Sequence, residues 1–293
     1  MKFWSQFWLL LLLVAAGFAL SMLTGVPAYF LRTSGRYIEY LHVIQWGQNI
    51  FVMILAPLAW ARLVDLRNEN IKGWGWKESF NDLRLVRPDW RFIILTLCLM
   101  AVSLPMLSNM EVFFSTLPLP DALREYCETE LMQNYMVIGL LLRPSGILAW
   151  TEQILLLCVT TAIGEELLFR GAMLKCFSNC HFNRHAAAIL IGFIFAAIHF
   201  ELYGLVPRWL MGTAFVYLLY WSKSLWVPIT AHCINNLIAL IQYKMATPEE
   251  LANPRSEYEF SAIAVCVSVI ATGIALWVIR RMGSTTDSSS KEI

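Results

Sequence analysis

Charged side chains are scarce in this sequence, and neither sign is in excess. Only 15% of the 293 residues are charged, whereas soluble domains usually carry about 25%. The 22 basic and 21 acidic side chains give a net charge of +1, so the basic excess that nucleic-acid binding needs is missing. With 58% hydrophobic residues and a mean hydropathy of +0.58, the chain is expected to be an all-α polytopic membrane protein. Its expected surroundings are the lipid bilayer, with no nucleic-acid partner.

A dense cysteine framework is also missing. The seven cysteines are an odd number, and most lie in or near apolar segments, where a free thiol behaves as a small hydrophobic group. One short stretch has the spacing of a possible metal-binding sequence: Cys176, Cys180 and His181. A zinc site needs about four placed ligands, so a chance grouping in a short turn is the simpler interpretation.

Apolar runs long enough to cross a bilayer, which takes about 20 residues, predict a bundle of about eight spanning helices. The runs are 7–23, 41–61, 92–110, 148–168, 186–202, 207–222, 226–243 and 260–279. The first is expected to be an uncleaved helix, because it exceeds a signal-peptide core and no small-x-small site precedes Thr24.

Basic residues concentrate in the loops that would face one side of the membrane, most clearly in the loop from Arg62 to Arg91. By the positive-inside rule this places both termini in the cytoplasm, with Arg32 and Arg36 as exceptions. The expected compartment is the bacterial inner membrane.

The chain is expected to divide into four segments. Residues 1–145 form an N-terminal transmembrane region, with an amphipathic or interfacial segment at Lys72–Trp90 and an acidic outer stretch, Asp121–Gln133, read as a solvated helical face. Residues 146–245 form a helical core that carries the polar motifs. A final transmembrane helix occupies 246–282, and 283–293 is a Ser/Thr-rich tail expected to be disordered.

Ionisable residues inside apolar segments are costly and therefore suggest function. The first group is Glu165, Glu166 and Arg170 at the end of the fourth run. Glu166 and Arg170 are four residues apart and share a helix face, whereas Glu165 is rotated by about 100°. Pairing of Glu166 with Arg170 would leave Glu165 available as a general base. The alternative is that the helix ends here, with both acids in water.

Two further groups lie on later runs. Phe195 and His199 are four apart in the fifth run, where a lone histidine is often a satisfied core group, and Glu201 beyond them is a candidate ligand or base. His232 and Asn236 share a face of the seventh run and can both donate hydrogen bonds to one point, as an oxyanion site requires. An interhelical polar clamp is the alternative for this last pair.

A further basic residue, Arg208, opens the sixth run and can extend toward the membrane interface.

Several known protease motifs are missing from the sequence. It contains no Gly-x-Ser-x-Gly elbow, no His-Glu-x-x-His zinc motif and no Gly-x-Gly-Asp motif. What it contains is Glu-Glu-x-x-x-Arg, Phe-x-x-x-His and His-x-x-x-Asn, in that order, on three apolar helices. This ordered set resembles the CPBP family of CAAX-type prenyl endopeptidases and bacteriocin-processing or self-immunity proteins, over about residues 148–243.

The resemblance implies an intramembrane endopeptidase acting on a membrane-associated peptide or protein. Glu165 would activate a water with support from Glu166 and Arg170, and His199 would assist on that water or bind a metal. His232 and Asn236 would stabilise the oxyanion.

The family is often described as metalloproteases, so a divalent metal such as zinc on His199, His232 and Glu165 is one option. A glutamate-activated water without a metal is the other. Two functions other than an enzyme are alternatives. One is a non-proteolytic self-immunity or scaffold protein of the same fold, and the other is a proton- or ion-coupled transporter. Transporters often show two related halves with interrupted helices, whereas here the polar motifs gather in one half.

Overall fold

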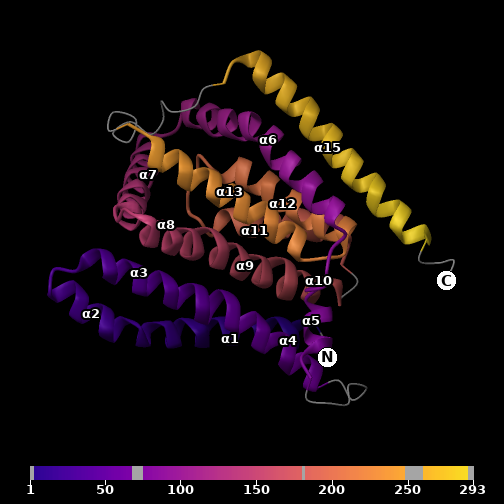
Figure 1. Cartoon of the computed structure of the whole chain (residues 1–293), viewed down its shortest axis with the longest axis horizontal. Coiled ribbons are helices and arrows are strands. Elements are labelled where there is room, and N and C mark those ends of the chain that lie inside the picture. Colours follow the sequence, from indigo (N-terminus) through magenta and orange to yellow (C-terminus); the bar gives the residue numbers. More distant parts are fainter. Residues whose placement is uncertain (1–2, 68–74, 180–181, 248–259, 290–293) are drawn as a thin grey trace. The chain divides into compact units, whose positions relative to one another are not determined.

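The computed structural model describes residues 3–67, 75–179, 182–247 and 260–289, which are helical with no strand among them (Figure 1). The predicted all-α fold is therefore confirmed. The chain divides into two compact units. Unit 1 consists of Met1–Arg87, Gly139–Ala187 and Ser224–Leu237, and unit 2 of Pro88–Ile138, Ala188–Lys223 and Ile238–Ile293.

Several helices have the length and apolar character of membrane spans, which makes this an integral membrane protein. Five such helices occur in the part of the chain that the structure describes: Trp4–Thr33, Tyr37–Leu66, Trp90–Thr116, Ile147–Ser178 and Ala262–Ser284. The helices of the fifth, sixth and seventh predicted runs are shorter or more polar than this criterion requires, so the count of eight spans stays a prediction.

Unit 1 contains the N-terminal helices and the long helix of the first polar motif. Its elements are α1 (Phe3–Leu23), α2 (Gly25–Thr33), α3 (Tyr37–Gly47), η1 (Gln48–Leu55), α4 (Ala56–Leu66), α5 (Lys77–Asp82), α8 (Ile147–Gln153), η2 (Ile154–Thr160), α9 (Thr161–Glu166), η3 (Leu167–Met173), α10 (Leu174–Ser178) and the first part of α13 (Trp226–Met245), where η marks π-helical hydrogen bonding. Segment η1 packs between α1 and α9. Glycine permits both contacts, because a Cβ on Gly17 would lie 2.5 Å from the carbonyl oxygen of Phe51, and one on Gly164 2.5 Å from Cβ of Met53.

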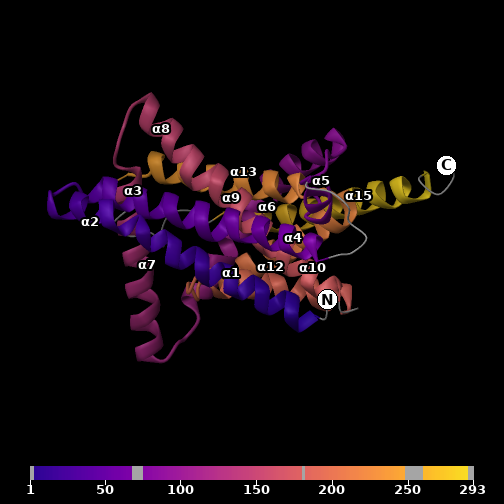
Figure 2. The ribbon, with the colours of Figure 1, turned by 90° about the horizontal axis from the view of Figure 1, so that it is seen from below.

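Unit 2 contains α6 (Trp90–Thr116), most of α7 (Asp121–Leu142), α11 (Arg184–Ala197) from Ala188 onward, α12 (Leu205–Ser222), the end of α13 and α15 (Ala262–Ser289). Helices α6 and α15 pack along each other, and α7 crosses the direction of α15 steeply (Figure 2). Pro105 interrupts the hydrogen bonding inside α6. There the hydroxyl of Ser268 accepts from the Met106 amide at 3.1 Å and donates to the Val102 carbonyl at 2.5 Å, which joins α15 to α6.

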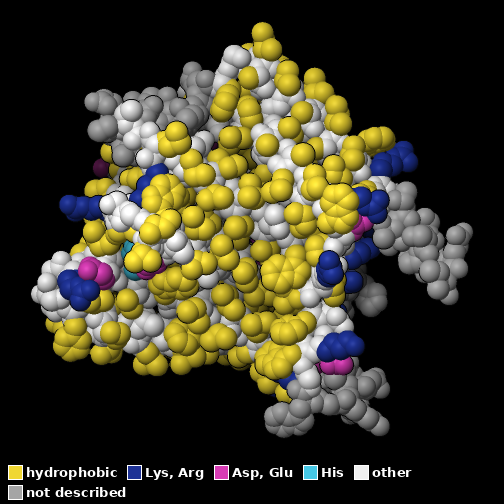
Figure 3. Space-filling view, in the orientation of Figure 1, with side chains coloured by type: hydrophobic (Ala, Val, Ile, Leu, Met, Phe, Trp, Pro, Cys, Tyr) yellow, Lys and Arg dark blue, Asp and Glu magenta, His cyan; other side chains and the backbone are white. Residues whose placement is uncertain are grey.

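The surface agrees with a lipid environment. Hydrophobic side chains cover most of the face in Figure 3, where charged side chains are few and lie toward its margins. Large apolar side chains of the spans are exposed, including Met22 (74%), Leu148 (84%) and Ile263 (78%). In water such surface would be costly, whereas lipid tails solvate it without penalty.

Three predicted segments lie outside the polar motifs. The acidic stretch Asp121–Gln133 is helical, as predicted, and belongs to the 22-residue helix α7. Of the interfacial segment Lys72–Trp90, residues 72–74 lie outside the described part, and the rest contains the short helix α5 and the first residue of α6. Helix α15 extends to Ser289, past the expected start of the tail at Gly283, since each further residue of a formed helix adds a hydrogen bond.

Candidate active site

The first polar motif lies in the middle of a continuous helix, from Ile147 to Ser178. It does not lie at a helix end, so the alternative of two acids exposed to water at a terminus is wrong. The segment α9, which carries Glu165 and Glu166, is flanked by the π-helical segments η2 and η3. Such segments are rare and often accompany functional sites, because they release backbone carbonyls from the regular ladder.

Glu166 and Arg170 form the ion pair that their spacing predicts. Arg170 donates from a guanidinium nitrogen to Oε1 of Glu166 at 2.8 Å, and both side chains are fully buried. A buried pair of this kind is stable only while both partners are present, since either charge left unpaired has lost its hydration. The pair therefore fixes Glu166 as an ionised acceptor.

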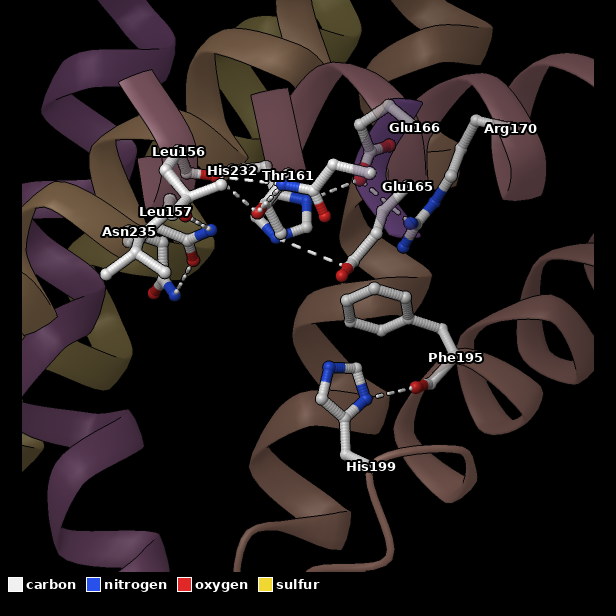
Figure 4. Close-up of polar contacts among 12 residues, drawn as sticks. Leu156, Leu157, Thr161, Glu165, Glu166, Arg170, Phe195, His199, His232 and Asn235 are labelled. Atoms are coloured by element: carbon white, nitrogen blue, oxygen red, sulfur yellow. Dashed lines mark hydrogen bonds and ion pairs between the residues drawn. The ribbon is translucent and has the colours of Figure 1, made fainter. Parts of the chain in front are cut away.

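His232 joins this pair from the neighbouring helix, α13, as Figure 4 shows. Its Nδ1 atom lies 2.8 Å from Oε1 of Glu166, and its Nε2 atom lies 3.7 Å from Oε2 of Glu165. Because the Glu166 carboxylate accepts, Nδ1 carries the hydrogen, and the neutral ring has its lone pair on Nε2. Glu166 thus orients His232, and His232 turns its other nitrogen toward Glu165.

Glu165 differs from Glu166 in its exposure and its partners. Its side chain is 13% exposed, whereas that of Glu166 is fully buried. Within the described ranges the Oε2 atoms of both glutamates are buried without a hydrogen-bond partner, but Glu166 is paired through Oε1 with Arg170 and His232. Two atoms 3.7 Å apart can both lie at about 2.8 Å, a normal hydrogen-bond length, from one water oxygen. The pair of Glu165 Oε2 and His232 Nε2 can therefore hold a single water molecule.

Asn236 connects α13 to the helix of the glutamates. Its side-chain amide donates to the Leu157 carbonyl in η2 at 3.1 Å. This contact is an interhelical polar clamp, the alternative considered for this residue. The same amide has a second N–H, and its role as an oxyanion donor stays a prediction.

Sequence reasoning missed one buried polar residue, Asn49 in η1. Its side chain is 2% exposed, and its amide donates at 3.0 Å to the Leu156 carbonyl and to the hydroxyls of Thr160 and Thr161. Asn49 thus holds the π-helical turn one helical turn before Glu165. An amide inside an apolar run was the signal that could have identified it.

His199 belongs to unit 2 and lies two residues beyond the end of α11 at Ala197. The fifth run was expected to continue helically to residue 202; the left-handed backbone of Phe200, with φ of 58°, is incompatible with that. The ring still contacts Phe195, with centroids 5.0 Å apart. Its Nδ1 donates to the Phe195 carbonyl at 2.7 Å, so the neutral ring has its lone pair on Nε2. The grouping of His199 with the glutamates stays a prediction.

Glu201 was considered as a ligand or base, but its carboxylate is occupied. One oxygen accepts from Asn134 at 2.8 Å, and the other forms an ion pair with Arg208. Arg208 therefore points to Glu201, a partner in its own unit.

The metal hypothesis requires donors in sufficient number. In unit 1 the donor atoms facing one point are Nε2 of His232 and Oε2 of Glu165, whereas a catalytic zinc takes about three protein ligands. Among described residues no group of three or more His, Cys, Asp or Glu side chains is arranged to hold a metal ion. A complete site would need His199 as well. In the cysteine tract Cys176 is buried, and Cys180 and His181 lie outside the described residues.

Comparison with known proteins identifies the segment that carries these motifs. Residues 147–238 match the family described as type II CAAX prenyl endopeptidase Rce1-like. The resemblance to the CAAX-type protease family is confirmed over this segment. It contains the three motifs from Glu165 to Asn236, and it supports a CAAX-type intramembrane endopeptidase as the general class of this chain. Searches of curated proteins and of solved structures each found no match.

Proposed function

We propose that this chain hydrolyses a peptide bond of a membrane-associated peptide or protein, using a water held by Glu165 and His232. The observation that carries the proposal is the 3.7 Å approach of Glu165 Oε2 to His232 Nε2. His232 is oriented for this by Glu166, and Glu166 is fixed by Arg170. One carboxylate thus orients a histidine while the other faces the water.

The proposed reaction follows from the acceptors at the site. Glu165 takes a proton from the water as the oxygen attacks the peptide carbonyl carbon, whose C=O electron pair moves to oxygen. When the C–N bond breaks, the leaving nitrogen receives that proton, from Glu165 or from His232 after transfer. Charge and atoms balance without a covalent enzyme intermediate.

His232 and Asn236 are the proposed donors to the oxyanion. With Nδ1–H directed to Glu166, Nε2 of His232 can donate to an oxyanion only when the ring is protonated. His232 therefore fits the oxyanion role as an imidazolium, and Asn236 would add a neutral donor.

Zinc is an optional part of the proposal. Glu165, His232 and His199 would be its ligands, and a bound zinc would supply a Lewis acid that polarises the carbonyl. His199 would otherwise assist on the water, as the family resemblance implies. The proposed setting is the bacterial inner membrane, and the loop charges favour an orientation with both termini in the cytoplasm.

Purified protein in lipid nanodiscs, a membrane-peptide library and mass spectrometry test the proposal. We expect Glu165→Gln to lower cleavage by at least about 100-fold, since general bases contribute 10²–10⁴, with unfolding unchanged. Glu125→Gln, at an exposed position of α7, is the matched control and should cleave like wild type.

A zinc chelator separates the two mechanisms in the same assay. Loss of cleavage that added zinc restores would make the metal essential, and unchanged cleavage would leave water activation to the glutamate. Full activity of Glu165→Gln would remove Glu165 from the mechanism. A wild-type protein that cleaves none of the peptides would favour the non-proteolytic or transporter alternatives.

A further inference from the structure

The turn that carries His199 is held by side chains from two other helices of unit 2. The turn comprises residues 198–204, between α11 and α12. His199 and Phe200 close it with backbone hydrogen bonds to Ala196 and Ala197, at 3.3 and 3.1 Å. Side chains of α7 and α12 add further contacts to the turn.

Glu201 supplies the central part of this support. Its Oε1 atom accepts from Asn134 of α7 at 2.8 Å, and its Oε2 atom pairs with Arg208 of α12. The Arg208 and Glu201 side chains are only 26% and 21% exposed, so solvent screens the pair incompletely. Glu201 therefore links three segments: α7, the turn and α12. We refer to Asn134, Glu201 and Arg208 as the Glu201 clamp.

The backbone of the turn is strained beside the clamp. Phe200 has a φ of 58°, in the left-handed region that costs free energy for any residue with a Cβ. Such a conformation persists where the surroundings fix it. Tyr126 of α7 contributes by donating from its hydroxyl to the Phe200 carbonyl at 3.3 Å. Helix α7 thus contacts both residues that follow His199.

The position of this turn decides where the His199 ring points. The ring nitrogen Nδ1 donates to the Phe195 carbonyl at 2.7 Å, from the last turn of α11. This bond requires that the His199 backbone lie just past the helix end, where the strained turn places it. If the turn relaxes, the bond loses its geometry and the ring loses its preference for the Nδ1–H tautomer.

We infer that the Glu201 clamp is a set of positioning residues, which hold the His199 ring in one orientation and one tautomer. Asn134 lies in α7, outside the matched segment 147–238. The orientation of the His199 ring would therefore depend on a helix that the family segment does not include. The catalytic consequence rests on the proposed function, but the effect on the ring does not.

Two measurements that need no substrate test the clamp. The first is hydrogen–deuterium exchange of residues 198–204 by mass spectrometry in nanodiscs. The second is ¹⁵N NMR of labelled histidine, with the His199 signal assigned by its loss in His199→Gln. For Glu201→Ala we expect about tenfold faster exchange in the turn, since its local opening becomes easier. We also expect mixed tautomers at His199.

Milder variants keep the test decisive if Glu201→Ala does not fold. Asn134→Ala removes a single hydrogen bond from a neutral amide and should show smaller changes in exchange and tautomer of the same kind. Glu201→Gln keeps an acceptor for Asn134 and should lie between Glu201→Ala and wild type in both measurements. Asn134→Ala combined with Glu201→Ala should be no worse than Glu201→Ala, because both remove the same contact. Glu125→Gln on the same helix is the control and should match wild type.

Activity provides a third, separate comparison. If the wild type cleaves, Asn134→Ala should lower kcat by about tenfold and leave KM unchanged, because a misplaced group loses alignment and not substrate affinity. Exchange and tautomer like wild type in folded Glu201→Ala and Asn134→Ala would overturn the clamp. A changed tautomer with undiminished kcat would support the clamp and refute its catalytic consequence. If the wild type cleaves nothing, the proposed function loses support, and the exchange and NMR results still decide the clamp.

Discussion

Removing Arg170 tests whether the buried charge pair organises the site. The guanidinium and the Glu166 carboxylate are 2.8 Å apart, and both side chains are fully buried. Arg170→Met keeps most of the side-chain volume and removes the charge. Glu166 then keeps the contact from His232 at 2.8 Å but loses its permanent counter-charge.

The expected cost follows from the burial. At an effective dielectric of about 20, two unit charges at this distance attract by about 6 kcal/mol, and most of that is offset by the hydration that both have lost. Breaking such a pair on one side costs about 3–5 kcal/mol. Because His232 still contacts Glu166, we expect the lower end, about 3 kcal/mol. This is a large part of the 5–15 kcal/mol that stabilises typical proteins.

Reversible unfolding in mixed detergent–denaturant micelles, followed by the fluorescence of the 12 tryptophans, measures this loss. A double variant, Glu166→Gln with Arg170→Met, removes both charges and keeps an acceptor for His232. It should be more stable than Arg170→Met, with a coupling of about 2 kcal/mol between the two sites, within the range seen for neighbours. Strictly additive effects would refute the pair as an energetic unit, and wild-type stability of Arg170→Met would refute its burial.

Three further substitutions have expected effects on stability or on catalysis. Gly164→Ala should destabilise by about 1–3 kcal/mol, because its Cβ would lie 2.5 Å from Cβ of Met53 and one helix must move; Gly273→Ala, whose Cβ meets nothing within 4 Å, is the control, and equal melting of both variants would contradict the close contact. Asn49→Leu should lower kcat more than it changes KM, because the carbonyl and hydroxyls of the turn before Glu165 lose their donor. An unchanged kcat would exclude a positioning role. Hydrogen bonds from Arg91 hold the pKa of Asp89 below its usual range. The Asp89 carboxylate therefore stabilises the fold at pH values above the usual Asp pKa, and this stability is lost as the pH falls through the lowered pKa. Asp89→Asn should remove this pH dependence, so an unchanged slope of stability against pH in acid unfolding would contradict the reasoning.

Local rules determined a large part of this protein. The scarcity of charge and the long apolar runs predicted the all-α membrane fold, because hydrocarbon admits helices whose backbone groups are paired internally. Helical spacing predicted the pair of Glu166 and Arg170, and it predicted the contact of Phe195 with His199. Both relations join residues four apart in the sequence, a separation at which local backbone geometry fixes the spatial distance.

Relations between helices could not be obtained this way. No spacing rule connects Asn49 to the Leu156 carbonyl of η2, or His232 to Glu166, since each contact depends on how two helices pack. The sequence also offered Glu201 as a ligand, and only its contacts with Asn134 and Arg208 made it structural. A carboxylate looks the same in the sequence whether water, an arginine or a substrate faces it.

The sequence by itself determined which residues are available for chemistry: two adjacent acids, two histidines and an asparagine in apolar helices. The tertiary structure of unit 1 decided how the two acids differ. Glu166 is buried against Arg170 and orients His232, whereas Glu165 keeps a 13% exposed side chain whose Oε2 atom faces Nε2 of His232 at 3.7 Å. The physical reason is that a 100° turn of the helix separates the two carboxylates, so that each meets a different nitrogen of the His232 ring. Helical spacing therefore predicted the pair of Glu166 with Arg170, and the packing of α13 placed His232 against both acids.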